Sequence, residues 1–148
     1  MKNRRLLWWT LVVIWCLGIY LVTDSPQFTG ENTQEVVTQT ITHIPTASEQ
    51  SVDSSILNLQ IRKFTHLSVF GFLAFLFWKA LKPSRSSYIL AWAFATVYAV
   101  TDEYHQSFET GRVASIIDIG IDSLGAIATL VIVFLYNRYI KNRLVIGN

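Results

Sequence analysis

The chain has 148 residues, of which 51% are hydrophobic and only 15% are charged. This composition is too apolar for an ordinary soluble domain, and the length leaves room for one domain, residues 1–148. The net charge of +2 comes from basic residues at the ends of apolar stretches, so nucleic-acid binding is not expected. Cys16 is the only cysteine, which excludes an intramolecular disulfide.

Four apolar stretches predict membrane-spanning helices at about residues 6–23, 64–81, 87–104 and 116–139. The first follows a basic start, but it is longer than the apolar part of a usual signal peptide. No small-residue cleavage site follows it, so it is interpreted as a retained span. The third and fourth stretches are rich in Ala, Gly and Ser, which permit close helix approach in lipid. We therefore expect these two to form the packed centre of the bundle, with the first facing lipid.

A long segment, residues 24–62, separates the first two predicted spans. It carries several Asp and Glu but no Lys or Arg before Arg62, whereas basic residues gather at the other ends of the spans. Short basic segments remain cytoplasmic, so the segment is predicted to be extracytoplasmic and both termini cytoplasmic. Within it, Ser54–Ile61 could form a short helix along the membrane interface. The predicted fold is an all-α integral membrane protein, a four-transmembrane-helix bundle with a long extracytoplasmic loop between helices 1 and 2.

Polar residues occur at a common depth in three of the predicted spans. His66, Asp102 and Asp122 each lie sixteen residues from the basic or polar residue at the cytoplasmic end of the span. At ~1.5 Å per residue this is about 24 Å into a hydrocarbon core ~30 Å thick. Helical spacing places Gln106 on the face of Asp102, and Asp118 on the face of Asp122. A carboxylate that faced lipid would cost ~2.5–3.5 kcal/mol, so we expect one polar pocket inside the bundle, near its outer surface.

These residues belong to motifs by which the chain resembles the VanZ-like membrane proteins, a family named for the accessory teicoplanin-resistance protein. The motifs match, in order, the family's K-x-x-H, D-E-x-x-Q, G-R and D-x-x-x-(D/N)-x-x-G-A elements. They are Arg62-Lys63-Phe64-Thr65-His66, Thr101-Asp102-Glu103-Tyr104-His105-Gln106, Thr110-Gly111-Arg112 and Asp118-Ile119-Gly120-Ile121-Asp122-Ser123-Leu124-Gly125-Ala126. The resemblance covers about residues 58–130, and one departure is Phe70, where the family often has a tyrosine. It implies a multi-pass protein of the bacterial cytoplasmic membrane, linked to reduced susceptibility to teicoplanin-type glycopeptides.

Two interpretations of the polar residues remain open. Asp102 and Glu103 could be a general acid–base pair, with Glu103 the freer to meet a substrate, or both could be closed in a structural ion network with basic residues. The candidate catalytic residues are His66, Asp102, Glu103, Asp118 and Asp122. The candidate substrate-binding residues are Arg62, Lys63, His66, His105, Gln106 and Arg112, where Arg112 offers a bidentate grip on a phosphate or carboxylate.

No ligand spacing typical of a metal site is present, although imidazole and carboxylates suit divalent ions, and no cofactor is expected. Ser115 lacks the signature of a nucleophile and is predicted to be a helix N-cap. The expected ligand is a membrane lipid or a lipid-linked cell-wall precursor. One alternative is an intramembrane enzyme that modifies a lipid head group or cell-wall precursor. The other is a non-catalytic assembly role, with a membrane-protein partner or as a homo-oligomer.

Overall fold

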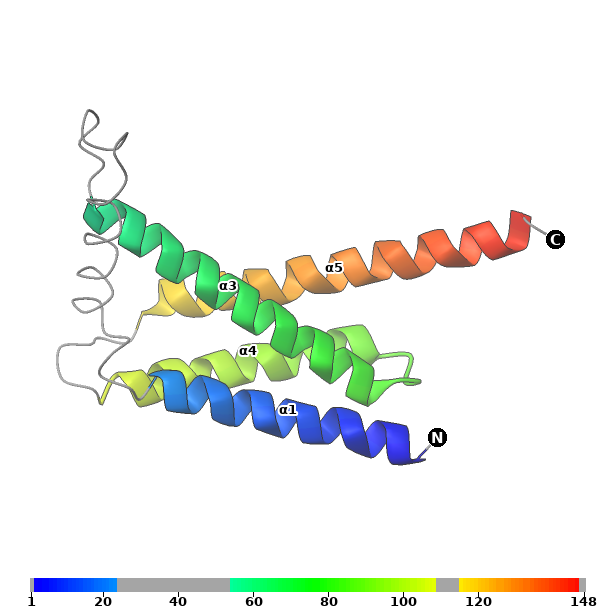
Figure 1. Ribbon diagram of the computed structural model, residues 1–148, viewed down its shortest axis with the longest axis horizontal. Coiled ribbons are helices and arrows are strands. Elements are labelled where there is room, and N and C mark those ends of the chain that lie inside the picture. Colours follow the sequence, from blue (N-terminus) through cyan, green and yellow to red (C-terminus); the bar gives the residue numbers. More distant parts are fainter. Residues whose placement is uncertain (1, 24–53, 109–114, 147–148) are drawn as a thin grey trace, which may run out of the picture.

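The computed structural model describes residues 2–23, 54–108 and 115–146. This part of the chain forms four helices, α1 (Lys2–Thr23), α3 (Ser54–Leu81), α4 (Ser87–Gln106) and α5 (Ile116–Ile146), and contains no strand. Figure 1 shows that successive helices run in opposite directions and that the two ends of the chain lie at the same end of the bundle. The all-helical fold predicted from the sequence is therefore confirmed for the described residues.

Three of the helices are long and apolar enough to cross a membrane. Their apolar segments are Asn3–Thr23 in α1, Ile56–Leu81 in α3 and Ile116–Arg143 in α5. Helix α4 has 20 residues, about 30 Å at ~1.5 Å per residue, but it is more polar and does not meet the same criterion. Its polar residues Asp102, Glu103 and Gln106 are all buried. They are thus directed into the bundle and away from its surface.

The helices differ from the predicted spans mainly at their ends. Helix α3 already begins at Ser54, so the short interfacial helix considered for Ser54–Ile61 is instead the first part of α3. No glycine or proline separates this part from the apolar residues that follow, so nothing interrupts the helical hydrogen bonds. Helix α5 extends to Ile146, the residue before Gly147, for the same reason. The rest of the predicted extracytoplasmic loop, residues 24–53, lies outside the described residues.

Helix α3 forms the centre of the bundle. It packs against α1, α4 and α5, and its most extensive contact is with α5. Its residues Phe70, Leu73 and Ala74 are almost completely buried. Several small residues of α4 and α5 are buried as expected, among them Ala95 and Ala126, although Gly120 and Ala128 are exposed. The expectation that these two helices form the centre is wrong. Composition shows that a helix can approach another closely, and it does not show which neighbour it approaches.

Two glycines allow α3 and α5 to cross at very short distance. A Cβ atom built at Gly125 would overlap the carbonyl oxygen of Leu67 and would lie 2.9 Å from the Leu67 carbonyl carbon and Cα. A Cβ atom at Gly71 would overlap Oγ1 of Thr129. Backbone therefore packs directly on backbone, the arrangement that small residues permit in membrane helices. Leu67 follows His66, and Gly125 lies about one turn beyond Asp122, so this crossing also sets the position of the polar side chains.

Helix α1 lies against α3 and, over a smaller area, α4. Aromatic donors attach it to both: Trp15 Nε1 donates to the Val69 carbonyl oxygen at 3.2 Å, and Tyr98 Oη donates to that of Cys16 at 2.6 Å. Much of its remaining surface is apolar and exposed, as expected for a span that faces lipid. Its last residue, Thr23, nevertheless reaches the polar cluster described below.

Candidate functional site

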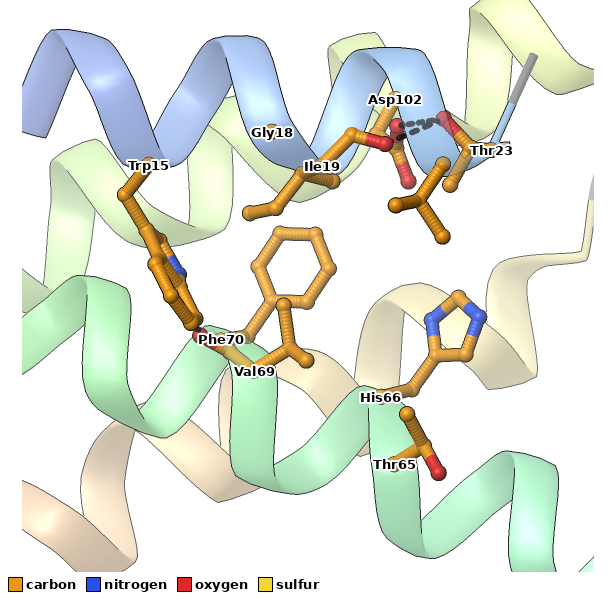
Figure 2. A pocket seen from close by; sticks show the side chains of 10 residues that line it. Trp15, Gly18, Ile19, Thr23, Thr65, His66, Val69, Phe70 and Asp102 are labelled. Carbon is orange, nitrogen blue, oxygen red and sulfur yellow. Dashed lines mark hydrogen bonds between the residues drawn. The ribbon is translucent and has the colours of Figure 1, made fainter. Parts of the chain in front are cut away.

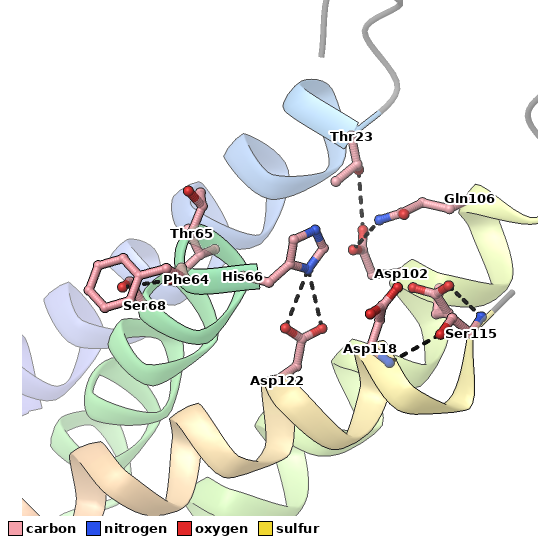
Figure 3. Close-up of polar contacts among 12 residues, drawn as sticks. Thr23, Phe64, Thr65, His66, Ser68, Asp102, Gln106, Ser115, Asp118 and Asp122 are labelled. Carbon is pink, nitrogen blue, oxygen red and sulfur yellow. Dashed lines mark hydrogen bonds and ion pairs between the residues drawn. The ribbon is translucent and has the colours of Figure 1, made fainter. Parts of the chain in front are cut away.

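All four helices contribute to a polar cluster at the end of the bundle opposite the chain termini (Figures 1 and 3). Helix α1 supplies Thr23 and α3 supplies His66; the others supply the acidic and amide groups, namely Asp102, Glu103, Gln106, Asp118 and Asp122. The convergence predicted from the sequence is thus observed for His66, Asp102, Gln106, Asp118 and Asp122. Arg112, a predicted binding residue, lies outside the described residues. The functional roles assigned to the cluster remain predictions.

His66 and Asp122 contact each other between α3 and α5, and this contact is an ion pair when the imidazole is protonated. His66 Nδ1 lies 3.3 Å from Oδ1 and 3.5 Å from Oδ2 of Asp122. The Asp122 side chain is only 2% exposed, whereas that of His66 is 24% exposed. A buried carboxylate favours the imidazole form with a proton on Nδ1, which leaves Nε2 as the other functional nitrogen. Within the described residues, Nε2 has no hydrogen-bond partner.

Asp102 is held by hydrogen bonds from two helices. Gln106 Nε2 donates to Oδ2 at 2.7 Å, the i to i+4 contact expected from the sequence. Thr23 Oγ1 lies 3.2 Å from Oδ1, and the carbonyl oxygens of Ile19 and Tyr20, at 2.9 Å and 3.1 Å, compete for the same hydroxyl proton. Sequence reasoning missed Thr23. The available signal was a hydroxyl at the outer end of a span, at the depth of the other polar residues.

Glu103 connects α4 to the start of α5. Its Oε1 accepts a hydrogen bond from the Ser115 backbone N–H at 2.6 Å, while Ser115 Oγ accepts one from the Asp118 N–H at 3.3 Å. Ser115 is therefore the N-cap of α5, as predicted, and Glu103 satisfies an additional N–H that the helix leaves unpaired. Glu103 is only 5% exposed. Only one of its two oxygens accepts a hydrogen bond within the described residues, whereas both oxygens of Asp102 do, and the expectation that Glu103 is the carboxylate freer to meet a substrate stays a prediction.

Asp118 differs from the other three carboxylates. Its side chain has no hydrogen bond or ion pair to any other described residue, and it lines a small cavity of about 90 Å³. The same cavity is lined by Arg62, Lys63 and His66, together with the apolar residues Leu59 and Ile121. Neither Arg62 nor Lys63 forms an ion pair within the described part of the chain. The structural ion network considered from the sequence is thus not formed by these two residues.

A second, apolar cavity of about 270 Å³ lies between α1 and α3 (Figure 2). Thr23, His66 and Asp102 contribute polar groups to its lining, and Phe70 stacks on the His66 ring with an interplanar angle of 13°. The remaining lining residues are Trp15, Gly18, Ile19, Val22, Thr65 and Val69. Sequence analysis did not foresee this cavity, because α1 was expected to face lipid. His66 lines both cavities and so lies between the polar and the apolar one.

Two other predicted binding residues line neither cavity. His105 packs against the Tyr20 ring of α1, with ring centroids 4.7 Å apart, and Gln106 is buried against Asp102. Both therefore pack next to the cluster and do not face either cavity. Among the described residues, no group of three or more His, Cys, Asp or Glu is arranged to hold a metal ion.

The combination of helices, motifs and polar cluster agrees with a comparison against known protein families. The sequence profile of the VanZ/LLP1 family matches residues 7–137, which include α3 and α4 completely, α1 except its start and α5 except its last part. No curated protein and no solved structure matches the chain significantly. The matched region covers most of the 148 residues, and the chain therefore belongs to the VanZ/LLP1 family of VanZ-like proteins.

Proposed function

We propose that this protein is a multi-pass protein of the bacterial cytoplasmic membrane that binds an envelope lipid or a lipid-linked cell-wall precursor. All four helices span the membrane, both termini are cytoplasmic, and the polar cluster lies in the outer leaflet. The distribution of basic residues supports this orientation, because Arg5, Lys79, Lys82 and Arg138 lie toward the helix ends opposite the cluster. Helix α4 is tolerated as a span because its acidic residues are buried in the bundle.

The proposal rests on one observation: two cavities that differ in polarity share a lining residue. His66 lines both the apolar cavity and the cavity with charged residues. An amphiphile has the same two parts, a hydrocarbon chain and a polar head group. At about 270 Å³, the apolar cavity is smaller than the ~300–1,000 Å³ of typical pockets for drug-sized ligands. It suits part of a hydrocarbon chain better than a whole glycopeptide antibiotic.

Reduced susceptibility to teicoplanin-type glycopeptides, which the family resemblance implies, would then be indirect. The protein changes how an envelope component is presented at the membrane surface, and it does not enclose the antibiotic. A host that carries the protein should accordingly show an altered response to these antibiotics only when the cavity is intact.

A second function, catalysis on the bound amphiphile, is favoured by the His66–Asp122 pair. A carboxylate that accepts a hydrogen bond from Nδ1–H leaves Nε2 able to accept a proton. In hydrolytic Asp–His pairs the aspartate orients the imidazole in this way, and Nε2 acts as the general base. Glu103 is a poorer candidate, since its Oε1 is occupied by the Ser115 N–H. Lipids and muropeptides from cells with and without the protein distinguish the two functions, because only an enzyme produces a new covalent species.

Blocking the apolar cavity tests the binding function. Gly18 lines the cavity, and a Cβ atom there has no neighbour within 4 Å, so the side chain added by Gly18→Leu begins in open space at the cavity wall. Gly120→Leu is the matched control, because Gly120 also has open space but lines neither cavity. Native mass spectrometry of the purified protein should show a bound lipid that is lost in Gly18→Leu and retained in Gly120→Leu. Equal lipid occupancy in both variants would contradict the proposal and favour the assembly role.

A further inference from the structure

The partners of the four carboxylates in the cluster indicate which chemical groups a ligand must provide. Asp122 faces His66, Asp102 accepts from Gln106, and Glu103 accepts from Ser115. Asp118 remains without such a partner among the described residues. It is also close enough to Glu103 and Asp122 for the like charges to act unfavourably on one another. Asp118 therefore lies where a positively charged hydrogen-bond donor is most strongly favoured.

The basic residues of the same cavity, by contrast, favour a negatively charged group of the ligand. Arg62 and Lys63 line the cavity with Asp118, and no described carboxylate lies within ion-pair distance of either one. An arginine and a lysine side by side bind phosphate well, the arginine through its planar fork and the lysine as a compact charge. The lining of this cavity of about 90 Å³ thus includes one acidic group and two basic groups that have no ion-pair partner among the described residues.

We infer that the ligand is a zwitterionic amphiphile whose head group combines a phosphate with a primary ammonium group, as in an aminoalkyl phosphate lipid. This inference rests on the proposed lipid-binding function and specifies its head group. The phosphate binds between Arg62 and Lys63, and the ammonium donates to Asp118. The hydrocarbon chain passes His66 into the apolar cavity between α1 and α3 (Figure 2). Every charge of ligand and cavity then has an opposite charge beside it.

The alternative head groups satisfy the cavity less well. A lipid with a phosphate but no ammonium leaves Asp118 unpaired and brings a second negative charge toward the acidic cluster. A quaternary ammonium carries the positive charge but has no N–H, so it makes no hydrogen bond to the Asp118 carboxylate.

The test is a competition among lipids that differ only in head group. The full-length protein is exchanged into mixed micelles containing equal amounts of phosphatidylethanolamine, phosphatidylglycerol and phosphatidylcholine, and bound lipid is measured by native mass spectrometry. We expect phosphatidylethanolamine to be bound about tenfold more than either of the others, because only its head group supplies a charge-assisted hydrogen bond to Asp118. Equal binding of the three lipids, or preference for phosphatidylglycerol, would overturn the inference without any variant.

Variants then assign the preference to residues. Asp118→Asn keeps the shape of the side chain and should abolish the discrimination while lipid remains bound. Replacing Arg62 and Lys63 together by glutamine should weaken the binding of all three lipids. Lys141→Gln, at the far end of α5, is the control for the loss of a positive charge. Unchanged discrimination in a folded Asp118→Asn protein would also refute the inference. A different result would refute the proposed lipid-binding function itself: lipid binding that is the same in Gly18→Leu and in the parent protein.

Discussion

Replacing Gly125 by alanine should separate α3 from α5 at the point where the candidate site is assembled. The added Cβ atom would lie 2.9 Å from the Leu67 carbonyl carbon and Cα, whereas ordinary contact begins at 3.4 Å. The helices must therefore move apart by at least 0.5 Å, and further to relieve the overlap with the Leu67 oxygen. The obstacle is backbone, so no side-chain rotation relieves it. His66 Nδ1 and Asp122 Oδ1 lie 3.3 Å apart at the same crossing, and this distance should increase by a similar amount.

The magnitude follows from a comparison with Gly120→Ala. Both substitutions remove a glycine from α5, which should stabilise the helix by roughly 1 kcal/mol. Gly120 has no atom within 4 Å of the added carbon, so only this gain applies there. Overpacking typically costs ~1–3 kcal/mol, and this should be the difference in the free energy of unfolding between the two variants.

Equilibrium unfolding in detergent micelles measures this difference directly. Binding of the lipid identified for the parent protein should also weaken in Gly125→Ala and remain unchanged in Gly120→Ala, because only the former displaces His66 from Asp122. If the two alanine variants unfold at the same free energy, α3 and α5 do not cross at Gly125, and the account of how the site is positioned is wrong.

Two further predictions concern the link between α4 and α5 and the membrane topology. Glu103→Ala should lower the free energy of unfolding by ~1–3 kcal/mol, because it leaves the partly buried Ser115 N–H without an acceptor, whereas Glu103→Gln retains an acceptor oxygen and should cost less. Lipid binding should persist in the glutamine variant; a normally abundant and stable variant that lost it would instead assign Glu103 to the ligand. Reporter tags at Met1 and Asn148 should both be found in the cytoplasm, and one inserted at Thr40 outside. A C-terminal tag outside the cell would refute the four-span arrangement.

Much of the architecture followed from local features of the sequence. Long apolar runs without an interrupting proline predicted the helices, because helix formation depends on nearby residues along the chain. The common depth of His66, Asp102 and Asp122 was predictable for a related reason, since the helical rise per residue is constant. The N-cap role of Ser115 was predictable as well, because capping contacts span only a few residues.

The partner of each polar group was decided only by the tertiary structure. Sequence spacing gives the angle of a side chain around its own helix, but it does not give the rotation or crossing of that helix relative to its neighbours. Contacts of Gly71 and Gly125 with α5 and α3 determine the crossing of these two helices, and that crossing pairs Asp122 with His66. The start of α5 beside α4 occupies Glu103 and leaves Asp118 facing Arg62 and Lys63. The apolar cavity also exists only in the folded protein, because its walls come from α1 and α3, which the sequence separates by thirty undescribed residues, 24–53.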